Sequence, residues 1–162
     1  MIWVLLICFS AQVEAGKYLP DQMLGEFKLE TSEGFTDFMY EIGVRWIKRQ
    51  IACTLYPVQQ IKEADDGEIS VDTLTTFKSL YTKFKLNEPW EEYTGDGRYT
   101  KTTTTVQDLS LIKVQIPKPD ATFNKTTREV RQFSPDGQTM TVINTIEGLP
   151  NKKSVRVYKR TQ

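Results

Sequence analysis

The sequence predicts a mainly β fold, an antiparallel barrel or clam of about ten strands with one pair of short helices near its start. Three observations lead to this prediction. Residues 34–51 have the apolar spacing of a helical face, most of the chain after Pro57 has strand-like patterning, and turn signatures interrupt that patterning at short intervals. No break in composition divides the chain, so one domain over residues 16–162 is predicted.

The first fifteen residues are predicted to be a secretory signal peptide rather than part of the fold. An apolar stretch from Ile2 to Phe9 is too short to span a bilayer, and the segment ends in Ala15, the small residue that a signal peptidase requires. No Lys or Arg lies next to Met1, so an uncleaved anchor is the alternative. Cleavage after Ala15 makes the mature chain an extracellular protein of 147 residues.

The first elements of the domain are a strand and the helical pair. Residues 25–29 alternate apolar and polar side chains, which predicts a strand. From Phe35 to Ile51 the apolar residues fall on one helical face that Gly43 interrupts. Two helices, at about 35–43 and about 45–53, are therefore predicted, with a turn at Gly43 between them and Pro57 after them.

Seven further stretches have period-two alternation or a high threonine content, which predicts strands. They are residues 69–71, 80–86, 98–106, 111–116, 123–133, 139–146 and 155–159. Turn signatures lie between them at residues 66–67, 95–97, 117–120, 135–137 and 148–151. Residues 102–105, 124–131 and 139–145 carry polar side chains on both faces, so a water-containing cavity is predicted, with solvated outer faces as the alternative.

The composition excludes several classes of function. The mature chain carries 21 basic and, without Glu14, 20 acidic residues, and this net charge of +1 gives no argument for a nucleic-acid partner. The chain has no histidine, which removes Ser-His and Cys-His nucleophiles and most zinc sites, so no enzyme, metal or cofactor is expected. Cys8 leaves with the signal peptide, so Cys53 cannot form an internal disulfide and is predicted to be a buried apolar filler.

One strand near the C-terminus has a face that could bind an anion. In residues 154–158 two valines alternate with Arg156 and Tyr158, so the guanidinium and the phenol point to the same side. If that side is the interior of a closed sheet, the two groups converge as a receptor for a carboxylate. The alternative is a surface strand on which both side chains are solvated.

Several blocks of the chain, in order and spacing, resemble the fatty-acid-binding proteins, the intracellular lipid-binding family of the calycin superfamily. The blocks are residues 25–29, 34–44, 75–78, 84–88, 94–98, 130–131 with 136–137, and 156–158. With a signal peptide added, the chain looks most similar to the secreted nematode-type members. The resemblance implies a ten-stranded antiparallel up-and-down β-barrel, or β-clam, with a helix-turn-helix lid through which the ligand enters.

The resemblance also implies roles for individual residues. Arg156 and Tyr158 correspond to the pair that binds the ligand carboxylate, and Arg131 corresponds to a second interior arginine that helps them to bind it. Phe77 corresponds to the phenylalanine at the portal. Asp96 and Arg98 correspond, more loosely, to interior polar residues. Glutamine and phenylalanine at the positions of Arg156 and Tyr158 are typical of members similar to retinol binders, so the residues present favour an acid.

Two lysines near the predicted portal and three departures from the family pattern complete the comparison with the family. Lys48 and Lys78 are candidate surface charges near the portal, although an ordinary solvated face is the favoured interpretation for each. Thr36 stands where the family usually has an acid, and the loops at 117–121 and 147–153 are longer than in cytosolic members. Longer loops alter the rim of a barrel and leave its interior unchanged.

The expected function is that of an extracellular monomeric carrier of long-chain fatty acids, with retinoids as a further ligand class and transient membrane contact during transfer. A lipocalin-type carrier is one alternative, although such proteins usually have Gly-x-Trp in the first strand and disulfides, whereas this chain has Gly25-Glu26-Phe27 and a single mature cysteine. An enzyme or a structural secreted protein with a vestigial pocket is the other. Asn124 begins an N-glycosylation sequon and is a candidate site for a surface glycan in a secreted chain, although such triplets also occur by chance and many stay unoccupied.

Overall fold

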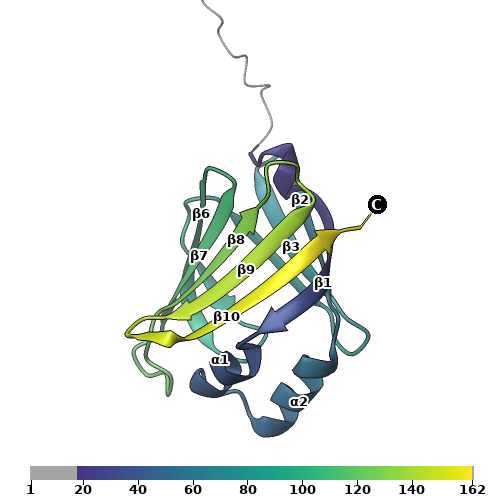
Figure 1. The fold of residues 1–162 in the computed structure, drawn as a ribbon. Helices are drawn as coiled ribbons and strands as arrows, with labels where there is room; N and C mark the ends of the chain where they lie inside the picture. The colour runs from purple at the N-terminus through teal and green to yellow at the C-terminus, as the bar shows by residue number, and fades with distance from the viewer. Residues whose placement is uncertain (1–17, 162) are drawn as a thin grey trace, which may run out of the picture.

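The computed structural model describes residues 18–161, and the predicted signal peptide lies outside this range. Within it, ten antiparallel strands form one sheet in the order β4-β3-β2-β1-β10-β9-β8-β7-β6-β5. The sheet curls into a nearly closed barrel whose lower end is covered by the two α-helices (Figure 1). The predicted β-clam with a helix-turn-helix lid is therefore confirmed.

The chain enters through a short 3-10 helix, η1 (Asp21–Met23), and the helices α1 (Phe35–Glu41) and α2 (Trp46–Thr54) follow the first strand. The strands are β1 (Gly25–Glu33), β2 (Val58–Glu63), β3 (Glu68–Leu74), β4 (Leu80–Lys85), β5 (Trp90–Tyr93), β6 (Tyr99–Gln107), β7 (Ser110–Pro117), β8 (Thr127–Phe133), β9 (Thr139–Ile146) and β10 (Leu149–Arg160). The helices begin and end within two residues of their predicted positions, and Gly43 forms the turn between them with a φ of +85°.

The sequence pattern missed or misplaced four strand features. β2 and β5 were not predicted, and β8 begins at Thr127 rather than at residue 123. The predicted long loop at 147–153 belongs largely to β10, whose pairing with β9 moves from Leu149 opposite Ile146 to Ser154 opposite Asn144. The extra residues therefore form an irregularity in a strand pair, which lengthens the β9–β10 hairpin at the lid end of the barrel (Figure 1).

The core consists of two clusters at opposite ends of the barrel. The end away from the lid is filled by side chains that include Leu19, Met23, Phe27, Phe133 and Met140. At the other end Phe38, Met39, Ile42 and Val44 from the lid region pack with Ile146 of β9. The first cluster also extends along the barrel wall to the candidate site, because it includes Leu111, Val142 and Tyr158.

The two end strands of the sheet, β4 and β5, are not neighbours in the strand order, so the barrel wall has an opening between them. Side chains cover this opening. Phe84 of β4 stacks on Trp90 of β5 with their rings 6.1 Å apart, and Leu80 of β4 lies directly against Gly95. Packing thus replaces main-chain hydrogen bonds at this one junction.

Cys53 is exposed, so the prediction that it is a buried filler was wrong. The reason is that Cys53 belongs to α2, a helix over the mouth of the barrel that has no fully buried residue and reaches the lid cluster only through a partly buried side chain, that of Ala52. The Cys53 Sγ lies 2.9 Å from Oγ1 of Thr36, which joins α2 to α1. Thr36, which stands where the family usually has an acid, thus contributes a polar contact within the lid.

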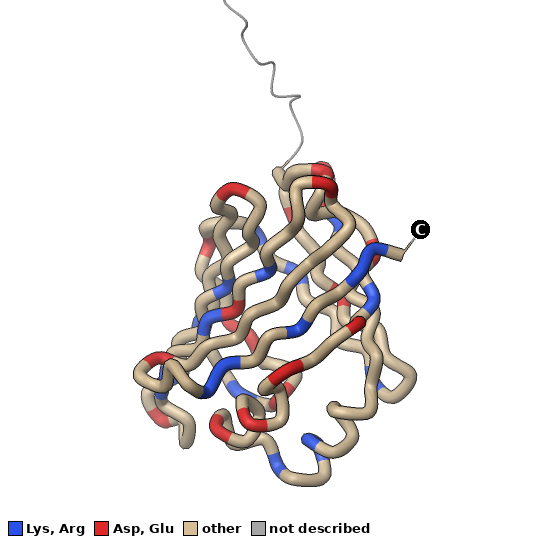
Figure 2. The backbone as a smooth tube through the Cα atoms, in the orientation of Figure 1, with Lys and Arg blue, Asp and Glu red and all other residues tan. Residues whose placement is uncertain are grey.

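The surface charges and the helices add two observations. Basic and acidic residues are interspersed along the strands instead of gathering by sign on separate faces (Figure 2). Of the helices in residues 18–161, none has the length and hydropathy that a membrane crossing requires.

Candidate functional site

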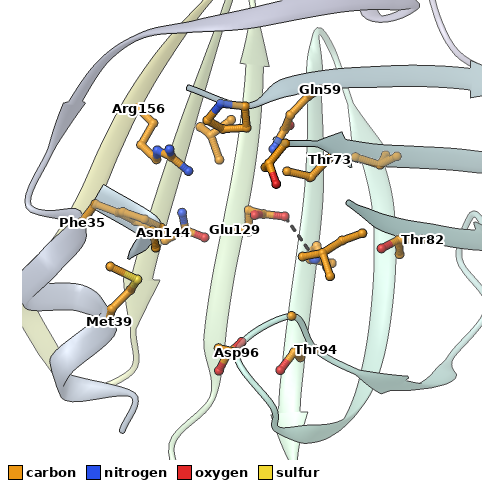
Figure 3. A pocket seen from close by; sticks show the side chains of 18 of the residues that line it. Phe35, Met39, Gln59, Thr73, Thr82, Thr94, Asp96, Glu129, Asn144 and Arg156 are labelled. Atoms are coloured by element: carbon orange, nitrogen blue, oxygen red, sulfur yellow. Dashed lines mark ion pairs between the residues drawn. The ribbon is translucent and has the colours of Figure 1, made fainter. Parts of the chain in front are cut away.

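A cavity of about 420 Å³ lies between the lid and the barrel wall. This volume is within the range of small-molecule sites, about 300 to 1,000 Å³. Phe38 and Met39 of α1, with Val71 and Leu111 of the strands, supply apolar lining. Polar side chains from several strands point into the same space, among them Arg156, Glu129, Gln59 and Asn144 (Figure 3). The cavity can therefore hold an amphiphile, with separate surroundings for its tail and its head group.

Strand register brings the predicted carboxylate-binding residues to one wall of this cavity. Arg156 of β10 pairs with Val142 of β9, which pairs with Arg131 of β8. Residues paired in this way share a face of the sheet, and Tyr158, two residues beyond Arg156, shares it too. All four residues line the cavity, so the predicted inward orientation of Arg156, Tyr158 and Arg131 is what the structure shows.

Arg156 and Tyr158 are buried without polar partners. Arg156 is 9% and Tyr158 0% exposed, and within residues 18–161 neither the Arg156 Nε nor the Tyr158 hydroxyl has a hydrogen-bond partner. Arg156 also forms no ion pair with the described residues, and its guanidinium carbon lies 4.1 Å from the centre of the Phe35 ring of the lid. An arginine and a hydroxyl in this state are free to bind an anion.

The electrostatics keep the phenol of Tyr158 in its hydrogen-donating form. Burial raises the pKa of Tyr158, while the positive charges of Arg156 and Arg131 work in the opposite direction; burial prevails, and the pKa lies above its ordinary value. The hydroxyl is therefore neutral at physiological pH, and it can donate a hydrogen bond to a carboxylate beside Arg156.

Arg131 reaches the same cavity with partners of its own. Its Nε donates to Oε1 of Gln59, 3.0 Å away on the far side of the barrel, and its Nη1 donates to the Glu129 carboxylate in an ion pair. Neither partner was predicted from the sequence. Glu129 could have been found, because it lies two residues before Arg131 and so shares its face of β8. Gln59 is 72 residues away and left no local signal.

A polar network continues from Glu129 toward β5. The Lys113 Nζ lies 3.3 Å from Oε1 of Glu129 and 3.4 Å from Oε1 of Glu92. Glu92 Oε2 also accepts hydrogen bonds from Thr102 at 2.8 Å and from the Gln115 amide at 2.7 Å. Sequence reasoning missed Glu92 and Lys113 because they come from β5 and β7, which meet only through the barrel interior.

Asp96 and Arg98, predicted as interior polar residues, also line the cavity. They form an ion pair at the turn that follows β5, with 2.5 Å between Arg98 Nε and Asp96 Oδ2. Arg98 also donates to Thr127 Oγ1 at 3.2 Å and to Gln115 Oε1 at 3.4 Å. This pair is thus part of the wall on the β5–β8 side, and Arg98 already has anionic and neutral acceptors.

Phe77, Lys48 and Lys78 lie at the rim of the cavity. All three line it while remaining exposed, and the Phe77 ring is 70% exposed. Lys48 belongs to α2, and the other two belong to the connection between β3 and β4. The structure therefore places Phe77, which the family resemblance assigned to the portal, together with both lysines at the rim of the cavity, and the two lysines are also solvated. Among residues 18–161 there is no group of His, Cys, Asp and Glu side chains able to hold a metal ion.

Glu129 makes barrel stability depend on pH. Burial raises the pKa of the Glu129 carboxyl, but Arg131 and Lys113 outweigh it and hold the pKa at about 2, below the usual 4.5. Because the folded pKa is the lower one, the stabilisation is complete above about pH 4.5 and is lost as the pH falls toward 2. A shift of this size corresponds to on the order of 3 kcal/mol.

We therefore expect the unfolding free energy of the wild type to fall more steeply between about pH 6 and pH 3 than that of a Glu129→Gln variant. Urea unfolding at a series of pH values measures both slopes. Glu91→Gln, a change on the outer wall where the carboxylate is 66% exposed, is the control and should keep the wild-type slope. Identical slopes for all three proteins would contradict the assignment.

Comparison with known proteins agrees with this geometry. The model of the lipocalin / cytosolic fatty-acid binding protein family matches residues 24–161. A fatty acid-binding protein of Tyrophagus putrescentiae is 36% identical over 140 residues, which are 86% of this chain and 98% of that protein. Fatty acid-binding protein homolog 5 of Caenorhabditis elegans is 37% identical over 95 residues, which are 59% of this chain and 69% of that protein.

A solved structure of a fatty acid binding protein has a similar fold. The fatty acid binding protein of Schistosoma mansoni, determined in complex with arachidonic acid, superposes with a TM-score of 0.75 at 31% identity and covers 88% of this chain and 98% of its own. The specific relation to secreted nematode members stays a prediction. The match over residues 24–161, the identity to fatty acid-binding proteins and the shared barrel show that the chain belongs to the lipocalin / cytosolic fatty-acid binding protein family.

Proposed function

We propose that this protein is a non-catalytic carrier of long-chain fatty acids, with the ligand carboxylate held by Arg156 and Tyr158 and the tail in the remaining cavity. The observation that carries the proposal is the pair of buried, unpartnered polar groups, Arg156 Nε and Tyr158 hydroxyl, on the wall of a cavity with apolar lining. Relatives described as fatty acid-binding proteins, one of them in complex with arachidonic acid, support it.

The two halves of a fatty acid make opposite demands on such a site. Each methylene removed from water contributes about 0.8 kcal/mol, so a sixteen-carbon tail contributes on the order of 10 kcal/mol before the costs of lost motion. A buried carboxylate instead costs several kcal/mol unless a cation and hydrogen bonds receive it. The tail thus supplies affinity, and Arg156 with Tyr158 supplies the preference for an acid over an alcohol or hydrocarbon.

The proposal extends to location, further ligands and transfer. A signal peptide over residues 1–15 would make the carrier extracellular, and the same carboxylate site would accept retinoids that carry an acid group. We propose that the protein acts as a monomer that touches membranes through α2. Trp46 and Ile47 on this helix are 64% and 66% exposed, and the helix carries Lys48 and Arg49 but no acidic residue, a combination suited to an anionic lipid surface.

Extraction of lipids from the purified protein tests the central claim. The protein is isolated from its native secretions, its bound lipids are extracted, and they are identified by mass spectrometry. We expect long-chain free carboxylic acids in roughly stoichiometric amount, because only an acid satisfies Arg156. A protein that carries no lipid, and that also fails to bind added hexadecanoate, would contradict the proposal.

The same sample tests the extracellular assignment through its intact mass. Loss of residues 1–15 is the result expected from cleavage after Ala15. Asn124 is exposed in the connection between β7 and β8, where a glycan can be attached, and additional mass that a glycosidase removes would show that the sequon is occupied. A protein found only inside cells with its first fifteen residues intact would contradict secretion.

A further inference from the structure

The charged side chains inside the cavity leave one cation without an anion. Apart from the rim lysines, the lining contains four cations (Arg98, Lys113, Arg131 and Arg156) and three anions (Glu92, Asp96 and Glu129). Asp96 pairs with Arg98, Glu92 lies beside Lys113, and Glu129 pairs with both Lys113 and Arg131. Within residues 18–161 only Arg156, of these four cations, has no anionic neighbour in an ion pair.

Next to the ligand site, Glu129 is the anion that offsets the positive charge of Arg131. Register puts Glu129 opposite Asn144, which lies opposite Ser154, in the row adjacent to that of Arg131, Val142 and Arg156. Figure 3 shows Glu129 projecting into the same cavity as Arg156. Its side chain is 16% exposed and that of Arg131 6%, so the ion pair between them is poorly screened by water. Arg131 is thereby neutralised before any ligand enters.

We propose that Glu129 is a specificity-determining residue that, by neutralising Arg131, restricts the cavity to one uncompensated positive charge and so selects amphiphiles with singly charged head groups over doubly charged ones. The proposal rests on the proposed function, because it concerns the head group that Arg156 binds. A fatty acid carboxylate carries one negative charge and matches Arg156. An alkyl phosphate, with a charge of about −1.5 to −2 at pH 7, would place a second charge beside the Glu129 carboxylate.

The alternative role for Arg131 is direct binding of the ligand carboxylate together with Arg156. The contacts of Arg131 argue against it. Its Nε and Nη1 already donate to Gln59 and Glu129, whereas the buried Nε of Arg156 has no partner among the described residues. A group with its hydrogen bonds made gains less from a new acceptor than a buried group that lacks one. The two roles predict opposite results when the Glu129–Arg131 pair is removed as a unit.

The experiment uses the mature chain with two probes that have the same tail, hexadecanoate and monohexadecyl phosphate. Their affinities are measured at pH 7 by displacement of a fluorescent fatty-acid analogue. We expect the wild type to prefer the carboxylate, and Glu129→Gln to shift the affinity ratio toward the phosphate by about tenfold or more. Glu91→Gln, which makes the same chemical change on the outer wall, should leave the ratio unchanged.

The double variant Glu129→Gln with Arg131→Gln removes both charges and keeps Lys113 beside Glu92. Removal of a buried pair as a unit leaves no unpaired charge, so this variant is expected to fold even if the single variant does not. It should keep hexadecanoate affinity within about threefold of the wild type and restore the wild-type ratio, since Arg156 remains.

Each outcome decides a separate claim. An unchanged ratio in a folded Glu129→Gln protein, or a large loss of hexadecanoate affinity in the double variant, would overturn the role of Glu129 while the carrier function stands. Failure of the wild type to bind hexadecanoate at all would instead overturn the proposed function. A shifted ratio in the single variant and a restored ratio in the double variant support the inference.

Discussion

Replacement of Arg156 by glutamine is expected to weaken hexadecanoate binding by roughly 100-fold, and hexadecan-1-ol binding by less than about threefold. The reason is that the tail contacts are the same for both ligands, whereas only the acid needs a cation. Without Arg156, no described cation on this wall is free of an anion, because Arg131 is held by Glu129. Displacement of a fluorescent fatty-acid analogue by each ligand measures the two changes.

Two matched variants separate the charge of Arg156 from its geometry. Arg156→Lys keeps the positive charge but loses the planar fork and the contact with the Phe35 ring, so we expect an affinity for hexadecanoate between those of the wild type and Arg156→Gln. Arg128→Gln makes the same substitution at an exposed position of β8 and should change neither affinity. Equal losses for acid and alcohol in Arg156→Gln would show that the side chain supports the barrel rather than the head group.

The orientation of Arg156 and Tyr158 could be predicted from the sequence because strand alternation is a local property. Two residues separated by one intervening position must share a face, whatever the rest of the fold does. The choice between inner and outer face came from the family resemblance, and the structure agrees with it. The same local rule could have predicted that Glu129 accompanies Arg131, since they are also two positions apart.

The partners of Arg131 and Lys113 could not be predicted, because they depend on how the barrel closes. Gln59 meets Arg131 across the interior, and Glu92 meets Lys113 from a strand that is not its direct neighbour. β5 was missed for a related reason: its four residues include two glutamates, and only their positions in the closed barrel show that Glu92 is buried and Glu91 is not. Alternation within a strand is encoded locally, whereas closure is a property of the whole sheet.

The lid shows a different limit of sequence patterns. The apolar spacing of residues 35–51 correctly predicted helices, whereas the expectation that Cys53 would be buried rested on its being an unpaired cysteine and was wrong. In α1 the apolar face does pack inward through Phe38 and Met39, but α2 buries none of its residues. A helix over the mouth of a ligand cavity can direct apolar side chains toward the ligand or toward other surfaces. Its apolar periodicity therefore does not show that it packs against a core.

The second large effect is expected at Gly34, where the lid joins the barrel. Gly34 precedes the first residue of α1 with a φ of +66°, and a Cβ there would lie 2.3 Å from the main-chain oxygen of Lys153 in β10. Main-chain atoms cannot rotate away as a side chain can, so Gly34→Ala must shift α1 relative to β10 in addition to adopting a disfavoured conformation. We expect the unfolding free energy to fall by roughly 2 to 4 kcal/mol, measured by urea unfolding.

Gly43 provides the matched control for this prediction. Its φ of +85° is equally unfavourable for alanine, but no atom lies within 4 Å of the position of its Cβ. Gly43→Ala should therefore lower the unfolding free energy only by the conformational cost of alanine at this φ, about 1 kcal/mol. Because Phe35 follows Gly34 and lies over the Arg156 guanidinium, displacement of α1 should also lower hexadecanoate affinity in Gly34→Ala and not in Gly43→Ala. Equal destabilisation by the two substitutions would mean that backbone strain, rather than contact with β10, sets the cost, and that the lid is not fixed to the barrel at this point.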